Sequence, residues 1–224
     1  MNIAIRSPGR LSNQLIMLYH AYTYHSGIER VYAPRFEEYR SYFNIDGEGV
    51  LCDQFFYEVN LESFKDVFWG GPAPVLPMEP NLYDDKYKGL KLKKPFEDKA
   101  SAILKSFGDV PLISVHIRHG DYKEFCDGLM FFSVEQYVHT ARRKVEDWGL
   151  TSYKILFFSD SVLPDIPEGV VVSRFTENEA PVDLFLMAQC NYFIYTWSTF
   201  SLLAMALSKS LGKYKDSKLM EREA

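Results

Sequence analysis

The densest group of potentially reactive side chains lies near the middle of the chain, in the segment His116-Ile117-Arg118-His119-Gly120-Asp121-Tyr122. The segment follows an apolar run typical of a buried parallel strand, and open α/β sheets bind their ligands at the carboxyl ends of such strands. Because the guanidinium of Arg118 can contact phosphate oxygens in pairs, the segment indicates an anion-binding site. The alternative is a charged turn at the end of a strand, in which Arg118 and Asp121 form a local ion pair.

A second candidate segment lies near the amino terminus, where residues 9–15 read Gly-Arg-Leu-Ser-Asn-Gln-Leu after the apolar run 2–6. We interpret it as a turn from a strand into a helix. Glycine allows close backbone approach there, and free N–H groups at a helix start can face an anion or a sugar hydroxyl. An ordinary tight turn is the alternative. The candidate substrate-binding residues of this segment are Gly9, Arg10, Asn13 and Gln14.

Two more polar segments follow apolar runs in the second half of the chain. In Phe157-Phe158-Ser159-Asp160-Ser161, the carboxylate and hydroxyls suit a ribose or a base edge, with a helix cap or an Asx turn as the alternative. In the segment 195–201, Ser198 or Thr199 caps the following helix and aims hydroxyl and N–H groups at a phosphate. The apolar residues around that cap are interpreted as core.

The scaffold for these segments is predicted by the pattern of the second half. Short apolar runs alternate with segments of helical periodicity, which is typical of a parallel sheet covered on both faces, a Rossmann-like half. Ser133 and Gln136 stand in capping-box register, and Pro181 suits the first turn of a helix. The predicted strands are 112–116, 155–158, 170–173 and 192–196, and the predicted helices are 133–148, 181–190 and 199–209.

Composition narrows the class of protein. With 224 residues, 47% hydrophobic and 25% charged, the chain is ordinary for a soluble globular protein. A net charge of −5 without an extended basic face argues against nucleic acid. The lysine run within 86–94 is interpreted as a solvated face. Between 29 and 108 the pattern predicts no topology, and a boundary near 107–111 is expected between two lobes.

The sequence also gives expectations for the cellular location of the protein and for its carboxyl-terminal segment. Three cysteines without metal-ligand spacing favour a reducing compartment, and the lack of a signal pattern after Met1 favours a cytoplasmic location. Polar residues interrupt the apolar stretch 184–207, which we interpret as helix, strand and helix and not as a membrane span. The Lys- and Glu-rich end, 213–224, is interpreted as a helical extension or as a linker within a larger protein.

Taken in order, these segments resemble one family. The patterns Gly-Gly/Arg-Leu-Gly-Asn-Gln-Leu, His-x-Arg-Arg-Gly-Asp-Tyr, Phe-Ser-Asp, and Asp-Leu-x-Leu-Met-Ser-x-Cys followed by Asn-Ser-Thr-Phe-Ser are those of the α-1,2-fucosyltransferases and their wider superfamily of α-1,6- and protein O-fucosyltransferases. Order and residue type agree across almost the whole chain. The match at 183–190 and again at 198–201 is the most specific.

The resemblance implies an α/β fold of GT-B type: two small Rossmann-like lobes with parallel sheets and a cleft between them, the amino-terminal lobe reduced. It implies an acceptor-side lobe at 1–108 and a nucleotide-sugar-binding lobe at 109–224. The implied reaction is inverting transfer of a 6-deoxyhexose such as L-fucose from a GDP- or UDP-linked donor to a hydroxyl of an oligosaccharide acceptor. No cofactor and no metal are expected, in keeping with the lack of an Asp-x-Asp element.

Residue roles follow from the same resemblance. The motif arginine corresponds to Arg118, and the general base that deprotonates the acceptor is expected to be Asp121 or, as second choice, Glu124. Asp121 as an ion-pair partner that orients Arg118 or Tyr122 is the alternative. The residues assigned to nucleotide-sugar binding in this half are His116, His119, Ser159, Asp160, Asp183, Ser198, Thr199 and Phe200.

The chain also departs from the family pattern. His119 stands where the pattern has a second arginine, Ser12 where it has glycine, and Leu202-Leu203 where it has paired tryptophans. Because one of two cationic partners for the donor is lost, an L-rhamnosyltransferase using UDP- or dTDP-rhamnose at the same site is a competing prediction. A non-catalytic nucleotide-sugar or glycan-binding module is the alternative from another class. A nicotinamide-dependent oxidoreductase is disfavoured because no G-x-G-x-x-G follows the first apolar run.

Overall fold

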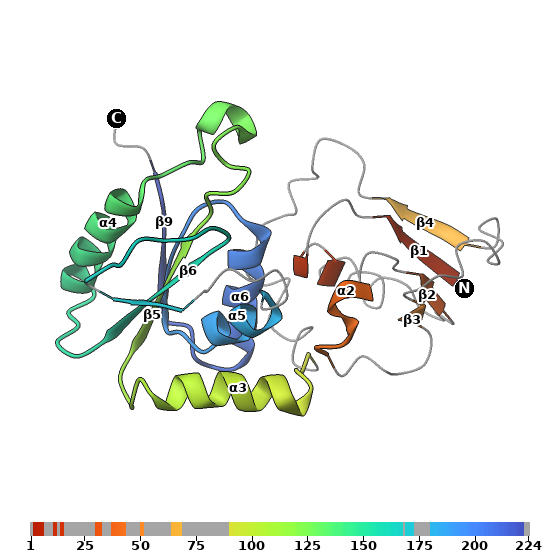
Figure 1. Ribbon diagram of the computed structural model, residues 1–224, viewed down its shortest axis with the longest axis horizontal. Helices are drawn as coiled ribbons and strands as arrows, with labels where there is room; N and C mark the ends of the chain where they lie inside the picture. The colour runs from red at the N-terminus through yellow and green to blue at the C-terminus, as the bar shows by residue number, and fades with distance from the viewer. Residues whose placement is uncertain are drawn as a thin grey trace. The chain divides into compact units, whose positions relative to one another are not determined.

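The chain divides into two compact units, Met1–Glu97 and Asp98–Ala224, and the described strands of each form a parallel sheet (Figure 1). The computed structural model describes residues 2–6, 11–12, 14–15, 30–32, 37–43, 50–51, 64–68, 90–167, 169–172 and 180–221.

The first unit contains a four-stranded sheet in the order β3-β2-β1-β4. The predicted strand at its start is confirmed as β1, Asn2–Arg6, which pairs in parallel with β2 and β4. Of the helix predicted after it, residues 11–12 and 14–15 are helical, and Leu11 and Leu15 are buried. The other elements of this part are β2 (Arg30–Tyr32), α2 (Glu37–Arg40), β3 (Val50–Leu51) and β4 (Phe64–Phe68). The helix α3 (Lys94–Lys105) begins in the first unit and continues into the second.

The second unit contains a five-stranded sheet in the order β7-β6-β5-β8-β9, in which every described pair of strands is parallel. Counted along the chain, this is the doubly wound order 3-2-1-4-5, which reverses direction between β5 and β8. The predicted strands are confirmed, although the third is shorter than expected. They are β5 (Leu112–Ile117), β6 (Lys154–Ser159), β7 (Val170–Val171) and β8 (Tyr192–Tyr195).

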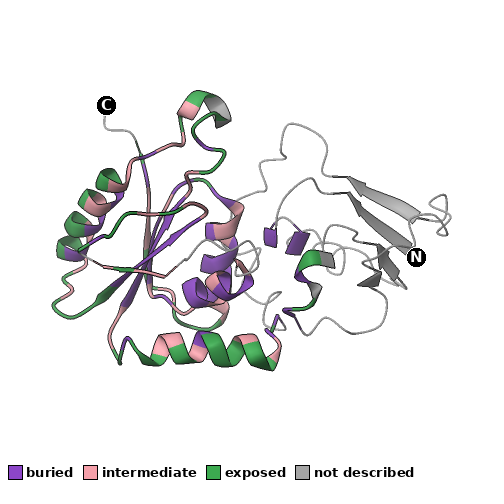
Figure 2. Ribbon diagram, in the orientation of Figure 1, coloured by how far each residue is buried: buried purple, intermediate pink, exposed green. Residues whose placement is uncertain are grey.

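Helices lie on both sides of this sheet, with α4 (Val134–Asp147) on one side and α5 (Ala180–Ala188) and α6 (Thr199–Ser210) on the other (Figure 1). Alternate residues of β5 serve the two layers. Ile113, Val115 and Ile117 belong to the core that includes α4, whereas His116 contacts α6. Burial is concentrated along the strands and along α5 and α6, while α4 turns an exposed face to solvent (Figure 2).

The helix caps predicted for α4 and α6 are both present. Ser133 accepts a hydrogen bond from the backbone N–H of Gln136 at 3.3 Å, and the Gln136 side chain accepts one from the N–H of Ser133 at 2.8 Å. This is the capping box that the sequence predicted for α4. Ser198 caps α6, since its hydroxyl accepts from the N–H of Phe200 at 3.3 Å.

The apolar stretch 184–207 folds as predicted into parts of α5, β8 and α6. Within the described ranges, no helix is both long and apolar enough to cross a membrane.

The interpretation of the carboxyl-terminal segment as a helix or a linker is wrong for residues 216–219. They form β9, Asp216–Leu219, which pairs in parallel with β8. Its flank is fixed by the Trp148 Nε1–H, which donates to the Asp216 carboxylate at 2.8 Å, and by the buried Met220. Because β9 is an edge strand, it tolerates charged residues, and for that reason its sequence has no apolar strand pattern.

Candidate active site at the carboxyl edge of the second sheet

Arg118 follows β5 directly and lies between two carboxylates. Its Nη1 is 2.6 Å from an oxygen of Asp160, which follows β6, and its Nη2 is 2.7 Å from an oxygen of Asp121. The Cζ atom of the guanidinium lies over the ring of Tyr122, 5.4 Å from the ring centroid. The Arg118 side chain is only 17% exposed, because Asp160, Asp121 and Tyr122 surround it.

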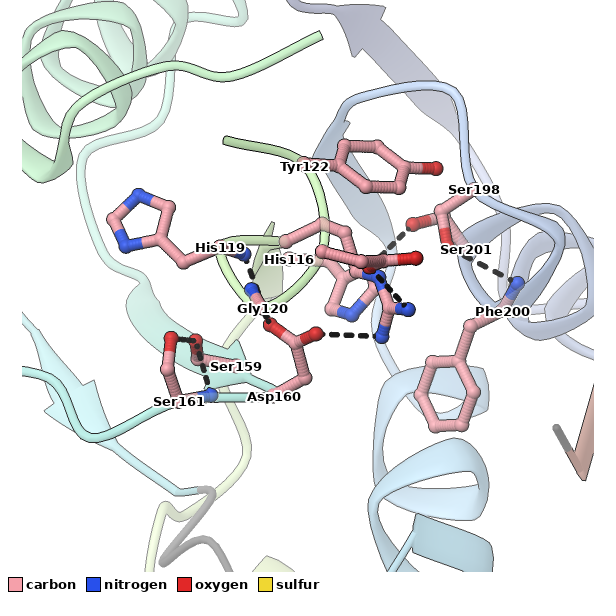
Figure 3. Close-up of polar contacts among 12 residues, drawn as sticks. His116, His119, Gly120, Tyr122, Ser159, Asp160, Ser161, Ser198, Phe200 and Ser201 are labelled. Carbon is pink, nitrogen blue, oxygen red and sulfur yellow. Dashed lines mark hydrogen bonds and ion pairs between the residues drawn. The ribbon is translucent and has the colours of Figure 1, made fainter. Parts of the chain in front are cut away.

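Asp160 is fixed more firmly than Asp121. Its Oδ1 accepts hydrogen bonds from the backbone N–H groups of His119 at 2.9 Å and of Gly120 at 3.1 Å, while Oδ2 pairs with Arg118 (Figure 3). A Cβ atom on Gly120 would lie 2.5 Å from Oδ2 of Asp160. Glycine is therefore needed at 120 because the carboxylate approaches the backbone too closely for any side chain.

The charge of Asp160 is stabilised by this environment. Burial alone would raise the pKa of Asp160, but the N–H of Gly120, the guanidinium of Arg118 and the N–H of His119 together hold that pKa below its ordinary value. Both oxygens of Asp160 are thus engaged within the protein. This geometry favours a role in orienting Arg118 over the expected direct contact with a ribose.

His116 connects β5 to the start of α6. Its Nδ1 lies 2.7 Å from the Ser201 hydroxyl, and its ring lies 5.3 Å from that of Phe200, centroid to centroid. Burial, followed by the charge of Arg118, lowers the pKa of His116 to about 4, although Asp160 acts in the opposite direction. A neutral imidazole therefore joins the strand that bears Arg118 to the helix that begins beside it.

The start of α6 reaches the same edge of the sheet. β5 and β8 pair with His116 opposite Tyr195, so Arg118 and the turn at 196–198 leave the sheet together. The Tyr122 hydroxyl donates to the backbone oxygen of Trp197, and the side chain of Trp197 is 40% exposed. Ser198 is buried and caps α6, whose first residue is Thr199.

His119 supports the loop that follows β5. Its Nε2 lies 2.8 Å from the carbonyl oxygen of Phe132, and its ring lies 4.6 Å from that of Phe131. In Figure 3 the ring points away from the Asp160 carboxylate. The side chain that replaces the second arginine of the family pattern is therefore engaged in holding this loop.

The remaining predicted residues are distributed more widely. The hydroxyl of Ser159 accepts from the N–H of Ser161 at 3.1 Å, a serine turn in place of the helix cap or Asx turn that was the alternative for this segment. Glu124 is exposed on the loop after β5, and Asp183 lies in the first turn of α5. Gln14 is buried in the first unit. The predictions for Gly9, Arg10 and Asn13 lie outside the described residues.

Three residues that contribute to this geometry were not among the predicted site residues. Gly120 admits the Asp160 carboxylate, Tyr122 supports Arg118 and bonds to Trp197, and Ser201 holds His116. Gly120 and Tyr122 stand within the central motif, so their position in the motif was the available signal. Ser201 likewise closes the matched segment 198–201, so its place in that motif was the available signal.

Among the residues the structure describes, no group of three or more His, Cys, Asp or Glu side chains is placed to hold a metal ion. The arrangement is instead one of oriented hydrogen-bond donors and a guanidinium, which is the chemistry of anion binding.

A hollow of about 360 Å³ lies at the opposite, amino edge of the same sheet. Its lining residues lie at helix ends, at strand starts or in the loops between them: Leu104, Gly108, Asp109, Val110, Pro111, Leu112, Gln189, Asn191, Lys213 and Lys215. None of the residues predicted to bind substrate is among them.

Comparison with known proteins supports the fold. NodZ, an α-1,6-fucosyltransferase, in a crystal soaked with GDP-fucose, matches with a TM-score of 0.58 and 16% identity over 92% of each chain. The fucosyltransferase NodZ from Bradyrhizobium matches with a TM-score of 0.56 and 16% identity over 92% of each chain. The second unit is thus a Rossmann-like α/β unit, and the chain resembles these fucosyltransferases in fold. No family model matches the sequence, and no curated protein matches it either.

Proposed function

We propose that the protein is a glycosyltransferase that transfers a 6-deoxyhexose, L-fucose or a related L-sugar, from a nucleoside diphosphate to a hydroxyl of a glycan. The observation that carries this proposal is the convergence of Arg118 and the capped start of α6 where the sheet order reverses between β5 and β8. Doubly wound sheets bind nucleotides at this point. The likeness in fold to a fucosyltransferase supports the same reaction class.

The proposed chemistry is a single displacement. The acceptor oxygen forms a bond to the anomeric carbon while the bond between that carbon and the diphosphate oxygen breaks, and the acceptor proton passes to a base. Negative charge grows on the leaving diphosphate, and Arg118 and the N–H groups at the start of α6 stabilise it. One preorganised donor of this kind contributes about 3–4 kcal/mol to transition-state stabilisation in other enzymes. Inversion and independence from metal belong to this proposal.

The general base is assigned to Asp121, with Glu124 as the second choice. Both side chains are exposed on the loop after β5, so an acceptor hydroxyl can reach them from solvent. Asp160 is unsuitable as a base because its carboxylate is already bound by two backbone N–H groups and by Arg118. In this proposal the donor binds to the lobe 109–224 and the acceptor to the lobe 1–108, in the cytoplasm.

The experiment is a transfer assay on the full chain with GDP-fucose, UDP-rhamnose and dTDP-rhamnose, each with and without a panel of oligosaccharide acceptors. Release of free nucleotide and formation of glycoside are both measured. Turnover with GDP-fucose supports the fucosyl donor, and turnover with a rhamnose donor assigns the competing sugar. Binding of a nucleotide sugar without transfer or slow hydrolysis would contradict catalysis and favour a binding module.

A further inference from the structure

Asp121 and Asp160 both pair with Arg118, yet the structure holds them very differently. The Asp160 side chain is 11% exposed, receives two backbone N–H bonds and is enclosed by Gly120. The Asp121 side chain is 57% exposed, and among the described residues its carboxylate pairs with Arg118 alone. An exposed ion pair of this kind contributes about 0.2–1 kcal/mol, so it exchanges easily.

The two pairs also occupy the hydrogen-bonding edge of the guanidinium. Nη1 faces Asp160 and Nη2 faces Asp121, while Cζ lies over the ring of Tyr122. A phosphate that binds through the two terminal nitrogens needs this edge. One of the two carboxylates must therefore move before an anion can bind to both Nη1 and Nη2. Among the described residues, backbone N–H groups bind the Asp160 carboxylate and none binds that of Asp121.

Charge leads to the same conclusion. Two carboxylates face one guanidinium, so the ion-paired group carries one net negative charge, and the neighbouring His116 is neutral near pH 7. A diphosphate approaching this group is repelled until Asp121 withdraws. When Asp121 leaves, Arg118 is balanced by Asp160 and gains a second anionic partner in the ligand.

We infer that Asp121 is an internal competitor of the donor diphosphate for Arg118 and so sets the donor affinity of the site. The inference rests on the proposed function, because it assigns to Arg118 the phosphates of a nucleoside diphosphate. In the donor-free protein Asp121 is a positioning residue that orients the guanidinium. It gives up Nη2 when the diphosphate binds, and its carboxylate is then available for the proposed role as general base.

The test is calorimetric titration of the full chain with GDP, UDP, dTDP and inorganic pyrophosphate, comparing the wild type with Asp121→Asn. The substitution keeps the shape of the side chain and removes its charge. We expect Asp121→Asn to bind pyrophosphate and the nucleotide two- to fivefold more tightly, the range that an exposed ion pair covers. In the transfer assay the donor KM falls by the same factor, whatever happens to kcat.

Asp127→Asn is the matched control. Asp127 is exposed on the same loop, and its backbone φ of 54° suits asparagine, so the variant removes one nearby charge without strain. We expect its affinities to change by less than a factor of two, which separates the loss of a specific competitor from a general change in charge.

The outcomes distinguish the two proposals. If Asp121→Asn tightens pyrophosphate binding but neither protein binds GDP, UDP or dTDP, the nucleotide-sugar function fails and the competition stands. Equal or weaker anion binding by Asp121→Asn, or an equal gain in Asp127→Asn, overturns the competition. Absence of any anion binding by both folded proteins overturns it as well, because no anion then replaces Asp121.

Discussion

The two edges of the second sheet differ in a way that shape alone does not reveal. The amino edge holds the hollow of about 360 Å³, bordered by Lys213 and Lys215 and by residues at the ends of α3 and α5. The carboxyl edge holds Arg118, Asp160 and the capped start of α6. Helices that connect parallel strands run opposite to them, so helix starts gather at the carboxyl edge and helix ends at the amino edge.

This direction decides which edge suits an anion. Unpaired N–H groups at a helix start carry partial positive charge, and unpaired carbonyl groups at a helix end carry partial negative charge. At the amino edge the exposed lysines lie beside helix ends, which lowers the attraction of that hollow for phosphate. At the carboxyl edge the guanidinium and the helix start act together. Under the proposed function, the orientation of hydrogen-bond donors, and not the volume of the hollow, decides which edge binds the diphosphate.

The largest expected difference between the two edges comes from replacing a cationic side chain at each, Arg118 at the carboxyl edge and Lys215 at the amino edge. Arg118→Ala removes the proposed diphosphate contact, and we expect turnover with the donor to fall about 100-fold or more, near 3 kcal/mol of transition-state stabilisation. Lys215→Ala, at the amino edge, serves as the control and should change kcat/KM less than twofold. Comparable losses in the two variants would show that the edges are not distinguished as we describe.

Acid tests whether His116 is the neutral link between β5 and α6. Its pKa is about 4 in the folded chain against 6.5 ordinarily, so between these values the unfolded chain binds more protons and folding stability falls as pH falls. We expect the His116 contribution between pH 7.5 and pH 5 to be roughly 2 kcal/mol of unfolding free energy. In urea unfolding, the free energy of unfolding of His116→Asn should fall by roughly 2 kcal/mol less than that of the wild type between pH 7.5 and pH 5.

His139→Asn, on α4, is the control for this measurement and should follow the wild type. An unchanged pH dependence in His116→Asn would mean that the imidazole is not kept neutral by its burial.

Glycine substitutions sharpen the comparison by separating the site from general stability. Gly120→Ala forces a Cβ to within 2.5 Å of the Asp160 carboxylate, which must shift and draw Arg118 with it. We expect donor affinity to fall roughly tenfold, which is about 1.4 kcal/mol. Gly108→Ala, beside the hollow, meets no atom within 4 Å but has a φ of +77°.

The second variant should therefore lose about 1 kcal/mol of stability by thermal unfolding and keep the donor affinity. Donor binding that weakens equally in both would point to a global effect of unfolding.

Two helix caps give the smallest and most selective comparison. Ser198→Ala and Ser133→Ala each remove a hydroxyl that caps a helix, and each should cost about 1 kcal/mol of unfolding free energy. Only the cap of α6 lies beside Arg118, so we expect a two- to threefold loss of donor affinity for Ser198→Ala and none for Ser133→Ala. Equal donor affinities of Ser198→Ala and Ser133→Ala would contradict a role of the α6 cap in donor binding.

The sequence predicted most of the second unit because its signals are local. Alternation of apolar runs with helical segments predicted β5, β6, β7 and β8, and the pair Ser133 and Gln136 predicted a capping box that is present. β9 was missed because the edge strand 216–219 is largely polar and its place depends on pairing with β8. Pairing between segments so distant in the sequence leaves little trace in local composition.

The site was predictable in kind but not in its connections. Arg118 and Asp160 were recognised as strand-end residues, yet their ion pair arises from the register of β5 and β6, which sequence alone does not fix. The contact between His116 and Ser201 likewise joins residues 85 positions apart. The role of Gly120 became evident once the position of the Asp160 carboxylate was known.

The central claim is that the diphosphate of the donor binds at the carboxyl edge, between Arg118 and the start of α6. A crystal structure of the full chain with GDP tests it most directly. The account predicts phosphate oxygens within hydrogen-bonding distance of the Arg118 guanidinium and of the N–H groups after Ser198, with Asp121 withdrawn from Nη2. Phosphates bound beside Lys213 and Lys215, with both carboxylates still on Arg118, would contradict it.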